Sequence, residues 1–124
     1  MSALCLAGGG ALVKIAATAF TLGFVHSIEK IPIVDAFVVA ADGLTLVESR
    51  IKGSGAGTEP APDARLQDGW YVWTPADGHR DALVLRRSGV SGTGDWTLCA
   101  NGACRPLGAL LPQGADPVTL TACP

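Results

Sequence analysis

Turn-forming residues interrupt this chain so often that no apolar run at helical period is long. The 124 residues include sixteen Gly and eight Pro, and short runs of alternating apolar and polar side chains lie between them. Alternation with a period of two is typical of strands that bury one face. Strands that recur about every ten residues, with turn signals between them, predict an all-β antiparallel fold, either a small sandwich or a partly open barrel.

The same alternation assigns the individual strands. Asp42-Gly43 between two apolar runs is a strong hairpin signal, and strict alternation along its second arm puts Leu44, Glu48 and Arg50 on one face. Asp68-Gly69 predicts a further turn, and we expect the three tryptophans to pack in the core. The expected strands are Ala3–Ala7, Ala11–Ile15, Ala19–His26, Ile31–Ala40, Leu44–Lys52, Gly69–Thr74, Leu83–Arg87, Asp95–Cys99, Ala103–Leu107 and Val118–Ala122.

The composition is that of one folded domain. A chain of 124 residues buries roughly two-thirds of its unfolded surface, so we expect a single domain over residues 1–124. Hydrophobic residues make up 48% and charged residues 16%, which excludes a disordered chain. A net charge of −2 offers no electrostatic field for nucleic acid. The most apolar window, Ala11–Val25, is too short for a membrane span and contains Lys14.

The four cysteines suggest two disulfides. Asn101-Gly102 suits a two-residue type I′ turn, because both central residues of that turn need positive φ. Such a turn places Cys99 directly opposite Cys104, at a separation that a disulfide can bridge after modest adjustment. Cys5 and Cys123 would then join the two termini, and so long a loop could stabilise the fold by on the order of 4 kcal/mol.

Two other states of the cysteines fit the sequence. Four reduced thiols are ordinary in a cytosolic protein. A zinc site fits less well, because the chain has no CxxC pair and His26 and His79 are distant in sequence. Disulfides favour the periplasm, whereas a start without the basic segment of a secretory signal favours the cytoplasm, so the compartment stays open.

Polar side chains gather at the end of one predicted strand, in the stretch FTLGFVHSIEK over residues 20–30. His26 and Ser27 cannot easily act as base and nucleophile, since neighbours on a strand point to opposite faces. His26 could instead share a face with Glu48 across a sheet, with Arg50 nearby. Such a cluster could bind a small anion; the alternative is a solvated strand end with ion pairs worth about 0–1 kcal/mol.

The glycine-rich segment GSGAGTEP over residues 53–60 resembles a phosphate loop only superficially. A P-loop needs GxxxxGK[ST] before a helix, and a dinucleotide fingerprint needs GxGxxG between a strand and a helix. Here the glycines run into Glu59-Pro60, inside a long predicted loop over Gly53–Arg65. Backbone N–H groups of such a loop could still cradle an anion, with Glu59 as the only carboxylate in the segment.

Several stretches resemble the bacterial domain-of-unknown-function 1850 family. They are FVHSIEKIPIVDAFVV, DGLTLVESRIKGSGAGTEP, LQDGWYVW and GDWTLCANGACRPL, and the combination of HSxE with GxGAGxEP is specific. The resemblance covers about residues 20–107. Family members often have Trp or Tyr where Phe24 stands, Glu near Asp35 and Met where Thr58 stands, and the Asp35 change shortens a carboxylate. The family motif falls on His26, Ser27, Glu29, Glu48, Gly55, Gly57 and Glu59.

The resemblance implies an accessory protein of a solute-uptake system. Family members are commonly encoded beside TRAP-type transporters of the TAXI class, and no biochemical activity is assigned to the family. We therefore expect a protein that binds a small anionic ligand or a TAXI-type transporter component without catalysis, and without a cofactor or metal. The expected ligand-binding residues are His26, Ser27, Glu29, Glu48, Arg50, Gly55, Gly57 and Glu59.

Two alternatives stay open at this point. A small hydrolase would use His26 and Glu59 as acid and base, which requires both side chains to converge within about 3 Å of a substrate atom or a bridging water. A purely structural partner of a permease would use the same residues only for local packing. The positions of His26 and Glu59 relative to each other would separate these alternatives.

Overall fold

The computed structural model describes residues 2–25, 31–53, 60–87 and 95–124, and within them the chain is built from antiparallel β-strands. The strands form two sheets, each of which ends in edge strands, so the fold is an open sandwich and not a closed barrel. The predicted all-β sandwich is therefore confirmed. The part of the chain that the structure describes contains no helix with the length and hydropathy of a membrane span.

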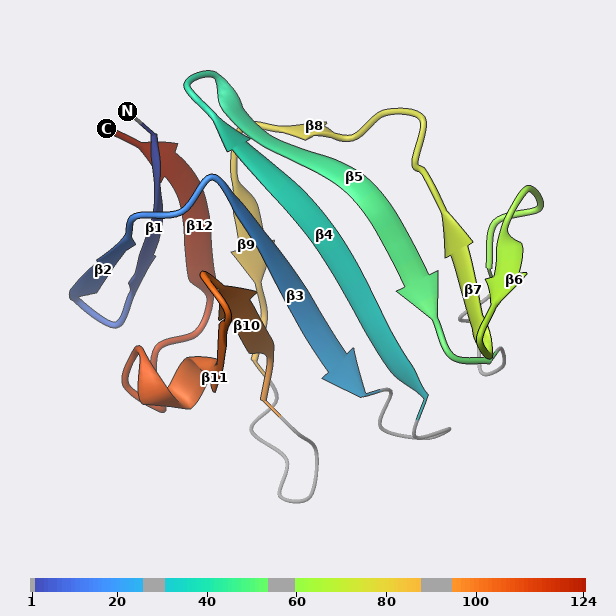
Figure 1. Cartoon of the computed structure of the whole chain (residues 1–124). Helices are drawn as coiled ribbons and strands as arrows, with labels where there is room; N and C mark the ends of the chain where they lie inside the picture. Colours follow the sequence, from blue (N-terminus) through green and yellow to red (C-terminus); the bar gives the residue numbers. More distant parts are fainter. Residues whose placement is uncertain (1, 26–30, 54–59, 88–94) are drawn as a thin grey trace.

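The smaller sheet brings the two ends of the chain together. Its strand order is β2-β1-β12-β9, and all three pairings are antiparallel. The first and last strands are direct neighbours, so the two termini lie side by side (Figure 1). The four strands are β1 (Ala3–Gly8), β2 (Ala11–Ile15), β9 (Leu83–Leu85) and β12 (Val118–Cys123).

The larger sheet extends beyond the smaller one. Its order is β11-β10-β3-β4-β5-β7-β6, and β8 pairs with β5 outside this path. In Figure 1, β7 and β6 lie on the side away from the smaller sheet. The strands are β3 (Ala19–Val25), β4 (Pro32–Ala40), β5 (Gly43–Ile51), β6 (Arg65–Gln67), β7 (Trp70–Trp73), β8 (His79–Arg80), β10 (Thr97–Ala100) and β11 (Ala103–Pro106).

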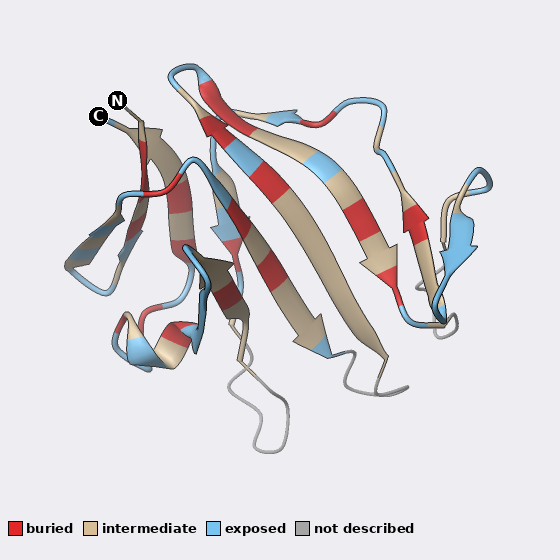
Figure 2. Cartoon of the chain, in the orientation of Figure 1, coloured by how far each residue is buried: buried red, intermediate tan, exposed pale blue. Residues whose placement is uncertain are grey.

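The core lies where the two sheets face each other. Leu4, Leu6 and Leu120 from the smaller sheet are fully buried against side chains of the larger sheet. Figure 2 shows buried bands along strands of both sheets. A short 3₁₀ helix, η1 (Leu107–Ala109), adds Leu107 to the same cluster. The other buried members are Phe20, Leu22, Phe37, Val39, Leu44, Leu85, Leu98, Leu111, Ala115 and Val118.

The predicted strands are all present, with ends shifted by at most two residues, but three short elements were not predicted. The strand β6 has three exposed residues and β8 has only two, so neither is long enough to show a periodic pattern. The 3₁₀ helix has three residues and begins at Leu107, the last residue of the predicted strand Ala103–Leu107. The predicted long loop ends where β6 begins, at Arg65.

Two-residue turns set the register of the hairpins. Asn101 and Gly102 have φ of 54° and 78°, as a type I′ turn requires, and Cys99 pairs directly with Cys104. Asp68-Gly69 forms a similar turn between β6 and β7. The prediction for the β4–β5 hairpin is wrong by one residue. Ala40 pairs with Gly43, so the turn residues there are Ala41-Asp42 and Gly43 begins β5.

A β-bulge corrects the predicted faces of β5. Ala36 pairs with Glu48, whereas the next residue of β4 pairs with Leu46, so Val47 is an extra residue. Leu44 therefore lies in the core, fully buried, while Glu48 lies on the opposite, outer face of the sheet. Strict alternation had put these two residues on one face. It fails because a bulge shifts the alternation by one residue.

Both predicted disulfides are formed. Cys5 and Cys123 are bonded with their Cα atoms 6.0 Å apart and close a separation of 118 residues. Cys99 and Cys104 are bonded across the β10–β11 hairpin. All four cysteines are oxidised, so the alternatives of reduced thiols and of a cysteine-ligated zinc site are wrong for this structure. Within the described ranges, no group of three His, Cys, Asp or Glu side chains is arranged to hold a metal.

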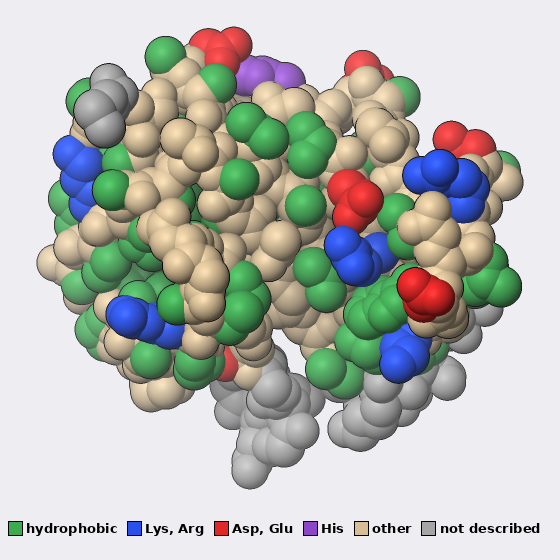
Figure 3. Space-filling view, viewed as in Figure 1, with side chains coloured by type: hydrophobic (Ala, Val, Ile, Leu, Met, Phe, Trp, Pro, Cys, Tyr) green, Lys and Arg blue, Asp and Glu red, His purple; other side chains and the backbone are tan. Residues whose placement is uncertain are grey.

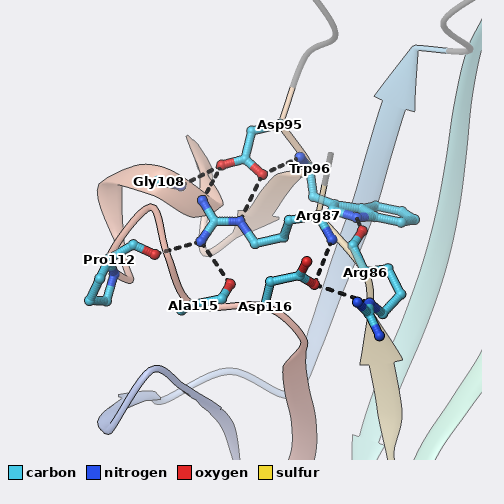
Figure 4. A network of polar contacts seen from close by, with 8 residues as sticks. All are labelled: Arg86, Arg87, Asp95, Trp96, Gly108, Pro112, Ala115 and Asp116. Atoms are coloured by element: carbon cyan, nitrogen blue, oxygen red, sulfur yellow. Dashed lines mark hydrogen bonds and ion pairs between the residues drawn. The ribbon is translucent and has the colours of Figure 1, made fainter. Parts of the chain in front are cut away.

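An ion pair joins the chain after β9 to the chain before β10 (Figure 4). The guanidinium of Arg87 contacts the carboxylate of Asp95 at 2.8 Å, and the Arg87 side chain is only 5% exposed. Arg87 also donates to two backbone carbonyls, and Asp95 accepts from two backbone N–H groups. The network therefore holds the segment around η1 against the larger sheet. These backbone partners belong to Pro112, Ala115, Trp96 and Gly108.

Candidate functional site

Most of the predicted ligand-binding residues lie outside the described residues. These are His26, Ser27, Glu29, Gly55, Gly57 and Glu59, so the predicted cluster around them, and the hydrolase that would use His26 and Glu59, stay predictions. Among the described neighbours of these segments, Val25 pairs with Pro32, and the backbone N–H of Lys52 donates to the carbonyl of Pro32 at 3.1 Å. The ends of β3 and β5 and the start of β4 thus meet at one end of the larger sheet.

Glu48 and Arg50 are described, and the structure brings them together. They stand two positions apart on β5, so their side chains leave the same, outer face of the sheet. Arg50 Nη2 donates to Glu48 Oε2 at 2.9 Å. The Arg50 side chain is 42% exposed and the Glu48 side chain is 36% exposed, so this ion pair is accessible to solvent.

Trp70 completes the arrangement from the neighbouring strand. Arg50 pairs with Val72 across β5 and β7, which places Trp70 diagonally beside Arg50 on the same face. The guanidinium carbon of Arg50 lies 5.8 Å from the centroid of the Trp70 ring, and Lys52 Nζ lies 5.9 Å from it. Both distances are within the range of cation–π interactions. The expectation that every tryptophan packs in the core is therefore wrong for Trp70.

These side chains surround a small open hollow of about 240 Å³, which we call the Trp70 hollow. The Asp68-Gly69 turn supplies one wall, because it folds β6 back beside β7. In the space-filling view, basic and acidic side chains lie next to one another over β5 and β7 (Figure 3). The Trp70 hollow is lined by Glu48, Arg50, Gln67, Asp68, Trp70 and Val72.

The comparison with protein families decides where the chain belongs. The model of the domain of unknown function (DUF1850) matches residues 20–107. The chain belongs to the DUF1850 family. The matched region runs from β3 to Leu107 and so includes almost all of the larger sheet and the whole Trp70 hollow. No curated protein and no solved structure matches this DUF1850 chain.

A second polar position of the DUF1850 domain lies on the opposite face of the same sheet. Asp35 pairs with Leu22 on one side and with Ser49 on the other, in a row that faces the core. Burial raises the pKa of the Asp35 carboxyl above its usual range, and a hydrogen bond from the Ser49 side chain lowers this pKa in part. Ser49 itself is only 6% exposed.

The two polar positions do not form one site. Ser49 and Glu48 are neighbours in β5, so their side chains leave opposite faces of the sheet. The sequence pointed to Asp35 only through the resemblance, and nothing in the pattern around it marked the residue as buried. Trp70 was equally hard to single out, although its alternation with Tyr71 does place it on the face of Val72.

Proposed function

We propose that this DUF1850 protein is a non-catalytic accessory component of a TRAP-type uptake system of the TAXI class. We further propose that its Trp70 hollow binds a small zwitterionic ligand, which carries one negative and one positive group. The transporter link is supported by the resemblance, since family members are commonly encoded beside such transporters. The observation that carries the binding proposal is the position of Arg50, between the Glu48 carboxylate and the Trp70 ring.

Arg50 indicates that the ligand has a negatively charged group. The contact with Glu48 and the packing near Trp70 hold the guanidinium in one orientation, so less side-chain entropy is lost when a ligand binds. A guanidinium presents its N–H groups in a planar fork that suits a carboxylate. We therefore expect the ligand to place a carboxylate against Arg50.

The acidic lining of the hollow indicates that the ligand also has a positively charged group. Glu48 and Asp68 both line the hollow, so a ligand with only negative charge would meet two carboxylates at short range. An ammonium group on the ligand would be attracted by the same carboxylates. The hollow thus favours a ligand with a carboxylate and an ammonium group, such as a free amino acid, over the simple anion expected from the sequence.

Size and chemistry support binding of a small molecule without reaction. A volume of about 240 Å³ is below the usual range of drug-sized pockets, which begins near about 300 Å³. Among its described lining residues there is no Ser, Thr, Cys, Lys or His side chain, which are the usual nucleophiles and bases of covalent catalysis.

A matched set of three compounds tests the binding proposal. L-glutamine carries both charges, 4-aminobutanamide lacks its carboxylate and glutaramate lacks its ammonium group. In an NMR titration of the ¹⁵N-labelled protein, we expect saturable shifts for L-glutamine at the amides of residues 48–52 and 67–72, and at least about tenfold weaker binding of the other two. Equal affinity for all three compounds would contradict the proposal.

Two arginines provide the matched variants. Arg50→Gln should weaken L-glutamine binding about tenfold or more, because it removes the charge that pairs with the carboxylate. Arg105→Gln, on β11 and outside the lining, should leave the affinity unchanged. If both variants bind L-glutamine like the parent protein, the Trp70 hollow is not the binding site.

The transporter link has a separate test. Uptake of solutes by the TAXI-class system should fall in a strain that lacks this gene and should recover when the gene is restored. Unchanged uptake in the deleted strain would refute the link to the transporter and leave the ligand titration as an independent result.

The outer face of the larger sheet supports docking of a transporter component as a second candidate. Val38 and Val47, from the adjacent strands β4 and β5, are 41% and 39% exposed and lie close to each other across the pairing of these strands. Exposed apolar side chains that lie together on one surface are typical of interaction sites. Val38→Glu should abolish binding to a purified component of the TAXI system, and retained binding would exclude this face.

A further inference from the structure

The sandwich is open between the edge strand β2 of the smaller sheet and the edge strand β11 of the larger sheet. Val13 and Ile15 of β2 pair with Leu6 and Leu4, which are core residues, so they face the interior. On the other side, Arg105 of β11 pairs with a buried leucine of β10. The gap between these two edges therefore leads from solvent to the core.

Covalent and polar contacts hold the two sides of this opening in place. The Asn101 side chain donates from Nδ2 to the carbonyl of Ala16 at 3.0 Å, which ties the tip of the β10–β11 hairpin to the chain after β2. The Cys99–Cys104 disulfide closes the same hairpin. The opening is thus preformed, and a ligand would not need to order it.

The lining combines an apolar floor with positive charge at the rim. Leu98 is 3% exposed and forms part of the floor, while the Arg105 side chain is exposed at the rim. Lys14 stands between the inward-facing Val13 and Ile15 on β2, so its exposed side chain leaves the opposite face of the smaller sheet. No acidic residue lines the opening, and neither cation forms an ion pair with another described residue. The volume is about 270 Å³. The full lining is Val13, Lys14, Ile15, Leu98, Ala100, Asn101, Ala103, Arg105 and Leu110.

We propose that this opening binds a small monocarboxylate with a short apolar chain. The carboxylate lies against the Arg105 guanidinium, and the chain lies on the apolar floor around Leu98. An inorganic anion would leave that floor unused, and a polar zwitterion would bury an ammonium group beside a cation. This site goes beyond the Trp70 hollow in both place and ligand class, since it lies at the other end of the larger sheet.

The volume sets the length of the chain. Each buried methylene group should raise the affinity about fourfold until the opening is full. A series of butanoate, hexanoate, octanoate and dodecanoate should therefore show increasing affinity up to a limit, because about 270 Å³ is near the lower end of known ligand pockets. A longer chain extends into solvent and adds nothing.

The experiment uses octanoate with two matched compounds, octylamine and octan-1-ol, and the oxidised full-length protein. In an NMR titration we expect octanoate to shift the amides of Val13, Ala100 and Leu110 in a saturable manner, and the two other compounds to bind at least about tenfold more weakly. Arg105→Gln should weaken octanoate binding about tenfold, whereas Lys14→Gln and Arg50→Gln should not. The charge reversal Arg105→Glu should change the preference from octanoate to octylamine.

Each outcome decides the proposal. Equal binding of octanoate and octan-1-ol, or an unchanged octanoate affinity in Arg105→Gln, would overturn it. Lys14 and Arg105 are exposed, so these variants should keep the melting temperature of the parent protein. Because the ligand, the variants and the shifted amides differ from those of the Trp70 hollow, one site can fail without the other.

Discussion

Arg87 and Asp95 are joined by two hydrogen bonds, from Arg87 Nη2 to Asp95 Oδ2 at 2.8 Å and from Arg87 Nε to Asp95 Oδ1 at 3.3 Å. The Arg87 side chain is 5% exposed. Its neighbour Arg86 makes a similar contact with Asp116 at 3.2 Å, but its side chain is 76% exposed. Two adjacent arginines thus provide a buried and an exposed ion pair in one protein.

The two arginines should differ in their contribution to stability. Arg87→Met leaves Asp95 partly buried without its partner and should lower the free energy of unfolding by about 3–5 kcal/mol. Arg86→Met should change it by about 1 kcal/mol or less, because water screens an exposed pair. Urea unfolding followed by tryptophan fluorescence measures both values, and equal losses would show that the buried network is not a stabilising element.

The two disulfides should also differ, because they close loops of different length. Replacing Cys5 and Cys123, 118 residues apart, with Ser should lower the free energy of unfolding by about 5 kcal/mol. Replacing Cys99 and Cys104, 5 residues apart, should cost only about 2 kcal/mol. Urea unfolding of both double variants compares the values. A larger loss for the short loop would mean that chain entropy is not the main source of stability.

Asp35 should make stability depend on pH. Its pKa is raised in the folded state, so the folded protein binds a proton more readily than the unfolded chain does. Stability from this group is fully present below the unfolded pKa of about 3.9 and is lost as the pH rises through the folded pKa. Asp35→Asn should therefore gain stability relative to the parent protein at neutral pH, and this gain should shrink as the pH falls.

Ser49 supplies the control for this prediction. Ser49→Ala removes the hydrogen bond that lowers the pKa of Asp35, so the carboxyl should titrate at a still higher pH in an NMR titration. If the Asp35 carboxyl titrates in its usual range in both proteins, burial of this group is not sufficient to shift its pKa.

Two glycines should resist substitution for different reasons. A Cβ at Gly102 would meet nothing within 4 Å, so Gly102→Ala should cost only the backbone penalty of a positive φ, about 1–2 kcal/mol. A Cβ at Gly78 would collide with the backbone carbonyl of Leu46, whose N–H donates to the Gly78 carbonyl at 2.8 Å. Gly78→Ala should cost about 3 kcal/mol, because the backbone itself must move. Thermal unfolding ranks the two, and the reverse order would contradict this assignment.

Local signals were sufficient for most of the fold. Alternation and turn residues predicted the strands, the type I′ turn at Asn101-Gly102 and the Cys99–Cys104 bond, because each depends on residues that are close in sequence. The Cys5–Cys123 bond was found by elimination, since it was the pair that remained. Strands of two or three residues, such as β6 and β8, carry too little pattern to be seen.

The candidate site was predicted only in part. The spacing of Glu48 and Arg50 on one strand placed them together, as the structure confirms. The contribution of Trp70 depends on the pairing of β5 with β7, and that pairing is a long-range choice. Of the described residues, Asp35 was noticed but its burial was not foreseen, because burial depends on which strands lie beside it.

The order of residues alone determined that this chain forms short antiparallel strands, where most of them turn back, and which cysteines meet at the hairpin. These outcomes follow from φ preferences and from alternation, which act over a few neighbouring residues. Tertiary structure alone decided which face of β5 Leu44 occupies, where the sandwich stays open, and that Arg105 stands at the rim of this opening. Such juxtapositions depend on a bulge and on the packing of one sheet against the other, and neither is encoded in any single stretch.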